Sequence, residues 1–262
     1  MYEPDWLVCE TPEPMLDFVG REACDRKLRL FACGCVRRAW RLLADPRSRA
    51  AVEAAEAFAD NEHLDPAAAR RAAEDAVWTA DGLAGRAAAR AAAEATADRR
   101  RGGWDVYLFP PQRPGAENLA AFREAARAAA QALALCRDEA ERPAYWADER
   151  LEQANLLRCV FGNPYAPVVL SPGWLSWRDG LVVEMAWAIY ERHCFGDLPI
   201  LADALEEAGC DDAAVLRHCR EPGPHARGCH VLDAVLGHDE PESLCGAEWF
   251  RSPDAGALAG AQ

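Results

Sequence analysis

Apolar residues recur at three- and four-residue steps along most of this chain, which is the spacing of an amphipathic α-helix. Asp-Pro pairs at 45–46 and 65–66 each supply a helix cap and a first-turn proline. The pattern therefore predicts a helix over 25–44, a second helix after Pro46, and an alanine-rich helical segment over 66–98. Gly82 and Gly85 are expected to weaken or break that last segment.

The second half carries the same helical signals, and two irregular segments interrupt the chain. Segment 99–115 contains paired glycines and three prolines, and its apolar residues predict an ordered loop that packs back on the body. Segment 161–177 holds the one strand-like run, which extended packing against helices would also explain. Helices are predicted at residues 116–141, 143–161, 179–194, 197–208, 211–219 and 229–236.

These elements predict an all-α protein, a multi-helix bundle of antiparallel helical hairpins with two irregular segments rich in proline, glycine and tryptophan. The expected organisation is an N-terminal helical lobe over 1–98, the ordered loop over 99–115 and a C-terminal helical lobe over 116–237. An acidic tail over 238–262 is expected to be flexible. The two lobes can pack as separate units or as one body.

Composition narrows the class of protein. The chain has 262 residues, 51% of them hydrophobic, which is ample for a packed core. Its formal net charge of −14 argues against a general nucleic-acid binder, because such proteins neutralise phosphates with basic residues. No apolar run approaches the roughly 20 residues of a membrane span, and the acidic start does not resemble a signal peptide. We therefore expect a cytoplasmic protein.

The numbers of cysteines and lysines affect how individual cysteines and arginines are interpreted. The chain has eleven cysteines, an odd number at irregular spacings, so reduced thiols are expected rather than a disulfide framework. Lys27 is the only lysine among 29 basic residues, and alanine fills long stretches. This indicates a GC-rich coding bias, which makes any one arginine weaker support for anion recognition.

The densest group of potential metal ligands lies near the C-terminus. Zinc needs about four thiolate or imidazole ligands in a tetrahedron, and a Pro-Gly-Pro loop could fold such residues together. The predicted set is His218, Cys219, His225 and Cys229, with Cys210 as a further candidate; His230 lies beside it. The Cys-x-x-Cys knuckle of many zinc sites is absent, so buried thiols and loop-fixing histidines are the alternative.

Two further candidate sites use residues of the same half. Arg220, His225 and Arg227 surround the Gly-Pro turn and could bind an anion, although arginines there could equally pair with the abundant carboxylates. Trp174 and Trp177 flank a Pro-Gly turn. They predict either a packed aromatic corner or, if exposed, a protein-binding hot spot.

Enzyme signatures are missing. The chain has no dinucleotide-binding glycine motif after a strand, no Walker loop, no Gly-x-Ser-x-Gly and no His-Glu-x-x-His. The thiols of Cys33 and Cys35, two apart on a predicted helix, diverge by about 200° and are expected in the core. No catalytic residue is predicted, and a non-enzymatic role is favoured.

Four segments carry a family resemblance: CDRKLRLFACGCVRRAW at 24–40, FGNPYAPV at 161–168, LPILADALEEAGC at 198–210 and HCREPGPHARGCHVLDAVLG at 218–237. On these motifs the chain resembles a large paralogous family of uncharacterised bacterial proteins. In that family a third cysteine commonly stands at the position of Val36, and tryptophan often stands at that of His230. The resemblance implies a modular bacterial protein with an interaction or regulatory role. The motif positions that match are Cys33, Cys35, His218, Cys219, His225 and Cys229.

The features above predict a helical adaptor or protein-interaction module whose partner is another protein, without a cofactor. The alternative is a metal- or anion-binding domain, with structural zinc or an enzymatic role, centred on the HCREPGPHARGC loop. No membrane partner is expected. Nucleic acid is expected as a partner only within a larger complex, if the arginines of 37–41 and 99–101 share one face.

Overall fold

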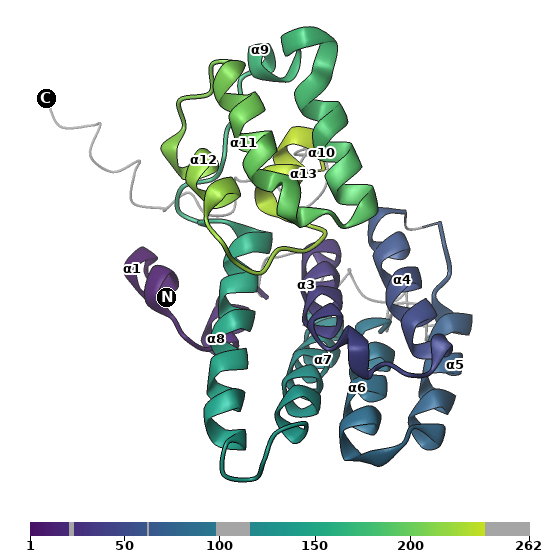
Figure 1. Cartoon of the computed structure of the whole chain (residues 1–262). Helices are drawn as coiled ribbons and strands as arrows, with labels where there is room; N and C mark the ends of the chain where they lie inside the picture. The colour runs from purple at the N-terminus through teal and green to yellow at the C-terminus, as the bar shows by residue number, and fades with distance from the viewer. Residues whose placement is uncertain (21–23, 62, 98–115, 239–262) are drawn as a thin grey trace, which may run out of the picture.

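The computed structural model describes residues 1–20, 24–61, 63–97 and 116–238 (Figure 1). Within these ranges all regular structure is helical, which confirms the prediction of an all-α multi-helix bundle. The predicted ordered loop over 99–115 lies outside the described residues, as does the predicted tail apart from its first residue. The first eight helices are α1 (Glu3–Val8), α2 (Pro12–Val19), α3 (Asp25–Arg38), α4 (Pro46–Asp60), α5 (Ala67–Thr79), α6 (Gly82–Ala95), α7 (Ala116–Leu135) and α8 (Arg142–Phe161).

Helix α3 runs through the centre of the bundle and packs against α4, α6, α7 and α8. Eleven of its fourteen residues are buried, among them Cys33 and Cys35 with no exposed surface, so these two thiols lie in the core as expected. The predicted helix over 25–44 is shorter than expected because a 3₁₀ turn, η1 (Trp40–Leu42), follows α3. The alanine-rich faces of α6 and α7 meet next to it, where small side chains allow a close approach.

The alanine-rich segment over 66–98 divides into two helices, and the break falls at residues 80–81, just before Gly82. Asp45 caps α4 by accepting a hydrogen bond from the backbone N–H of Arg47. Pro46 then occupies the first turn, so the predicted stop-and-restart signal forms as expected.

The C-terminal helices gather at one end of the bundle (Figure 1). Segment 162–177 forms no strand; it turns at residues 164–166, where the backbone N–H of Ala166 donates to the carbonyl oxygen of Asn163, and a short helix begins at Pro172. One buried apolar cluster extends from Trp6 in the first helix to Val235 in the last, so both predicted lobes contribute to it. The remaining helices are α9 (Pro172–Leu175), α10 (Leu181–Arg192), α11 (Leu198–Glu207), α12 (Ala213–Arg220) and α13 (His230–Leu236), with 3₁₀ turns η4 (Trp177–Gly180) and η5 (Phe195–Asp197).

Most cysteines of the described ranges follow the expectation of reduced thiols, since nine of them are free. Cys24 departs from it, because its sulfur is disulfide-bonded. None of the helices in the described ranges combines the length and the apolar character that crossing a membrane requires.

Candidate metal centre

Four potential metal ligands converge where α8, α12 and α13 meet. Cys159 lies in the last turn of α8, His218 lies on α12, and His225 lies in the loop that follows. Cys229 is the N-cap residue of α13. Their four ligand atoms, two sulfurs and two ring nitrogens, all lie within 4.8 Å of one another. In the part of the chain described here, these residues form the one group of histidine, cysteine or carboxylate side chains with that property.

The loop between α12 and α13 is held in place by two close backbone approaches to α3. A Cβ atom on Gly34 would lie 2.9 Å from the Cβ of Ala226, so glycine is needed where α3 meets the loop. Gly228 has a φ of +82° and lies against Leu30, a conformation and a spacing that favour glycine. The two glycines therefore let the loop lie flat on α3, which brings His225 and Cys229 toward α8.

The four side chains already contact one another in pairs. His218 Nε2 lies 3.3 Å from the Cys229 sulfur, and the Cys159 sulfur lies 3.4 Å from His225 Nδ1. The two imidazole rings meet edge to face, with centroids 5.1 Å apart. Ligand atoms around a tetrahedral zinc lie roughly 3.5–4 Å apart, so small side-chain adjustments would suffice to hold the ion. Two thiolates and two imidazoles form one of the ligand sets that zinc prefers.

Proton distribution in the cluster favours a metal-binding thiolate. Burial would raise the pKa of Cys229, but hydrogen bonding from Cys159 and the charge of His218 bring that pKa well below the ordinary range. The pKa of Cys159 is raised by its hydrogen bond to Cys229 and by burial, so Cys159 keeps its proton. Burial would lower the pKa of His218, and the Cys229 thiolate raises it instead. A cation at the centre would displace these protons.

A second layer of polar contacts orients the ligand-bearing segments. His230 Nδ1 lies 2.9 Å from the carbonyl oxygen of Cys159, and its ring lies 4.3 Å from that of His218. Burial lowers the pKa of His230 to about 4, so the ring is neutral at neutral pH. Lys27 donates to the carbonyl oxygens of Val160 and Gly228, each adjacent to one of the two cysteines. These contacts hold the backbone segments that carry Cys159 and Cys229 in place.

The observed cluster differs from the predicted ligand set in one member. His218, His225 and Cys229 come together as expected, and Cys159 takes the position given to Cys219. Cys219 and Cys210 are buried in the apolar core instead, at 1% and 3% exposure. No local spacing pointed to Cys159, because it belongs to a helix far from the Cys/His-rich stretch in sequence. A signal was present nonetheless, since Cys159 lies two residues before the start of the FGNPYAPV motif at 161–168.

The three residues of the predicted anion site contact different partners. Arg220 pairs with Asp203 and Glu206 of α11, at 2.7 and 2.5 Å. Arg227 pairs with Glu191 of α10 at 2.9 Å, and its guanidinium lies over the ring of Tyr190. His225 belongs to the cluster described above. The arrangement matches the alternative in which these arginines pair with carboxylates.

The tryptophans proposed as an interaction site lie against the body. Trp174 and Trp177 are both half-buried and pack against the apolar core, as expected for the packed aromatic corner that their spacing predicts. Trp187, on α10, is the more exposed side chain, at 51%. Protein binding by Trp174 and Trp177 stays a prediction.

Comparison with known proteins identifies no relative of this chain. No protein-family model matches the chain, and no curated protein or solved structure matches it. The resemblance drawn from the motifs therefore stays a prediction. We infer function from the chemistry of the residues that the structure brings together.

Proposed function

We propose that this chain is a zinc-binding helical domain, in which a structural zinc ion joins the C-terminal helices to the bundle through Cys159, His218, His225 and Cys229. The observation that supports the proposal is the convergence of these four ligand atoms within 4.8 Å. The ligands come from two helices, a loop and a helix cap, so chance proximity along one segment does not account for the grouping.

The number and burial of the ligands favour a structural role over a catalytic one. Four protein ligands complete a tetrahedron, whereas catalytic zinc keeps one position for water or substrate. Cys229 has no exposed surface and Cys159 is 2% exposed, so the sulfurs are closed to water. The same burial disfavours a role for Cys229 as a nucleophile, because a reactive thiolate must be reached by its substrate.

The ion would act as a cross-link between distant parts of the chain. Cys159 ends the long helix α8, whereas the other three ligands lie between residues 218 and 229. Binding would therefore hold the loop and the start of α13 against α8 and would restrict their local opening. In such sites the free energy of metal binding contributes directly to the free energy of folding.

Metal content of the purified full-length protein tests the proposal. We expect one zinc per chain after purification without chelators, and cobalt substitution should produce the absorption bands of a tetrahedral site with thiolate ligands. Cys159→Ser and Cys229→Ser should lose the metal, and His218→Gln and His225→Gln should bind it more weakly.

Cys219→Ser is the matched control, because Cys219 is buried close to the cluster but outside it. That variant should retain one zinc per chain. Folded wild-type protein that stays free of metal with zinc in excess would refute the proposal, and so would a loss of zinc in Cys219→Ser equal to that in Cys229→Ser.

The adaptor function stays a prediction beside this proposal. A structural zinc site is compatible with an interaction module, since it stabilises a surface without catalysing a reaction.

A further inference from the structure

We propose that a surface pocket beside the candidate metal centre admits small chelating molecules to the zinc ion, so that the ion is exchanged without unfolding of the domain. This inference rests on the proposed function and adds a route of metal exchange to it. The pocket has a volume of about 350 Å³. Its walls come from the turn η5, from the start of α11, from the end of α12 and from the loop that follows α12.

His225 belongs both to the ligand cluster and to the wall of this pocket. Its Nδ1 lies 3.4 Å from the Cys159 sulfur, and the side chain is half-buried. The two sulfurs of the cluster are closed to solvent, since Cys159 is 2% exposed and Cys229 has no exposed surface. The pocket therefore meets the cluster at an imidazole, and a molecule in the pocket reaches the ion past His225 rather than past a sulfur.

His225 is also the ligand with the least support from regular structure. Cys159 and His218 lie on helices, and Cys229 caps a third helix. His225 lies in the loop between α12 and α13, where a side chain turns away without disturbing a helix. Three remaining ligands would leave one open position on the ion, as in zinc sites that accept an external donor atom.

The exchange step is a ligand substitution. The bond between zinc and the His225 nitrogen breaks, and a bond between zinc and a donor atom of the chelator forms. The freed imidazole keeps its electron pair and takes up a proton from water when the pH requires it. Oxidation states do not change, so the step needs no oxidant or reductant.

Contacts around the pocket keep its walls in place. Arg220 at the end of α12 pairs with Asp203 and Glu206, which joins α12 to α11. In the loop, Pro222 and Pro224 stand on either side of a single glycine. Proline fixes its own φ, so this part of the loop has little freedom to fold into the pocket.

Two glycines of the wall border free space. A Cβ atom added to Gly196 or to Gly223 would meet no atom within 4 Å. Neither glycine has the left-handed backbone that disfavours a side chain. Larger side chains can therefore be placed at either position to fill the pocket without a clash at the Cβ atom.

The size and lining of the pocket indicate the class of molecule that enters it. Pockets that bind small molecules have volumes of about 300–1,000 Å³, so this one has room for a small chelator but not for a folded protein. Phe195 and Pro199 supply apolar surface for a ring. Zinc prefers nitrogen, sulfur and carboxylate donors, which the chelator must carry.

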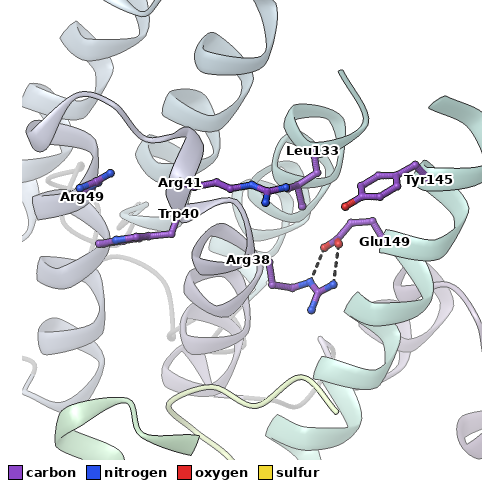
Figure 2. A pocket seen from close by; sticks show the side chains of 7 residues that line it. All are labelled: Arg38, Trp40, Arg41, Arg49, Leu133, Tyr145 and Glu149. Carbon is purple, nitrogen blue, oxygen red and sulfur yellow. Dashed lines mark hydrogen bonds and ion pairs between the residues drawn. The ribbon is translucent and has the colours of Figure 1, made fainter. Parts of the chain in front are cut away.

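A second pocket, at the C-terminal end of α3, provides a matched control. It has a volume of about 630 Å³, and Figure 2 shows Arg38 in its wall, bound to Glu149 by two hydrogen bonds. Glu149 precedes Cys159 on α8 by ten residues, which is about 15 Å along the helix. Arg41, an exposed residue, also lines this pocket (Figure 2). A large side chain placed there should leave the metal centre unaffected.

Release of zinc from the loaded full-length protein tests the proposal, with pyridylazoresorcinol as the chelator and its absorbance as the readout. The wild-type rate should rise in proportion to the chelator concentration, because the chelator takes part in the step that frees the ion. Gly196→Trp and Gly223→Trp place an indole in the pocket, and each should slow release about fivefold or more while one zinc per chain is retained. Arg41→Trp should release zinc at the wild-type rate.

Circular dichroism confirms that each variant is folded before the rates are compared, and the wild-type measurement needs no variant. A wild-type rate that is independent of chelator concentration would overturn the proposal, because the ion would then leave only when the protein opens by itself. Wild-type rates in both glycine variants would overturn it as well, and so would equal slowing by Arg41→Trp. Protein that binds zinc but fails these tests refutes only the exchange route, whereas protein that binds no zinc refutes the proposed function too.

Discussion

The ammonium group of Lys27 lies 2.8 Å from a carboxylate oxygen of Asp233, and both side chains are buried. The same ammonium reaches the carbonyl oxygens of Val160 and Gly228, so one residue of α3 ties together α8, the loop and α13. Burial would raise the pKa of Asp233, but Lys27 and Arg26 hold it well below the usual range. The only lysine of the chain therefore lies beside the candidate metal centre and connects the segments that form it.

We predict that Lys27→Arg destabilises the protein although it keeps the charge. A compact ammonium can direct its protons at three acceptors around it, whereas a planar guanidinium cannot do so in the same volume. The free energy of unfolding, measured by urea denaturation, should fall by about 1–3 kcal/mol. Arg71→Lys at an exposed site is the control and should change it by less than about 0.5 kcal/mol. Wild-type stability in Lys27→Arg would contradict the role assigned to the ammonium.

Removal of zinc should loosen one part of the molecule before the rest. With the proposed ion bound, a strong chelator should lower the melting temperature by on the order of 10 °C. Hydrogen exchange should then accelerate in the loop after α12 and at the start of α13, while α3 and α7 stay protected. Uniform acceleration along the chain, or none, would show that no ion links α8 to these segments. Cys229→Ser should reproduce the chelated pattern without chelator.

Helix ends were predictable from the sequence where a capping side chain or a glycine marks them. Asp212 illustrates this, because its carboxylate accepts from the backbone N–H groups of Ala214 and Val215 and starts α12 within the helix predicted over 211–219. Gly209 ends α11 with a φ of +96°, the left-handed conformation that glycine adopts easily. Caps and terminating glycines act over a few residues, so the sequence alone reveals them.

The ligand set was only partly predictable, because it depends on tertiary packing. His218, His225 and Cys229 lie close in sequence, and the Pro-Gly-Pro loop indicated that they could fold together. Cys159 reaches them only because α8 ends where the loop crosses α3. The three acceptors around the Lys27 ammonium were likewise not predictable, because they come from α8, from the loop and from α13.

Gly34 should tolerate no side chain, because it forms the contact between α3 and the loop that carries His225. A Cβ atom there would lie 2.9 Å from the Cβ of Ala226 and 2.9 Å from Leu156 Cδ2. Gly34→Ala should therefore lower the free energy of unfolding by about 1–3 kcal/mol and should weaken zinc binding.

The matched control for that change is Gly85→Ala on α6, where a Cβ atom would meet only Ala80, at 3.9 Å. Alanine is the better helix former, so this variant should be more stable than wild type by about 0.5–1 kcal/mol. Urea denaturation of both variants compares them directly. Equal effects of the two substitutions would contradict the close approach at Gly34.

His193 should make the protein lose stability in mild acid. Burial, followed by the charges of Arg37 and Arg227, lowers the pKa of His193 to about 4, and its Nδ1 is buried without a partner. The unfolded chain would bind the proton near pH 6.5, its usual pKa. Between about pH 6.5 and 4 the unfolded state therefore holds more protons, so the stability contribution of this residue falls as the pH falls.

His193→Asn should remove that dependence, and asparagine tolerates the left-handed backbone at this position, where φ is 55°. Between pH 7 and pH 5 the free energy of unfolding of the variant should improve relative to wild type by about 1–2 kcal/mol. His230, whose pKa is also about 4, is present in both proteins and cancels in the comparison. A difference between the two proteins that stays constant over this pH range would show that the His193 ring titrates alike in the folded and unfolded states.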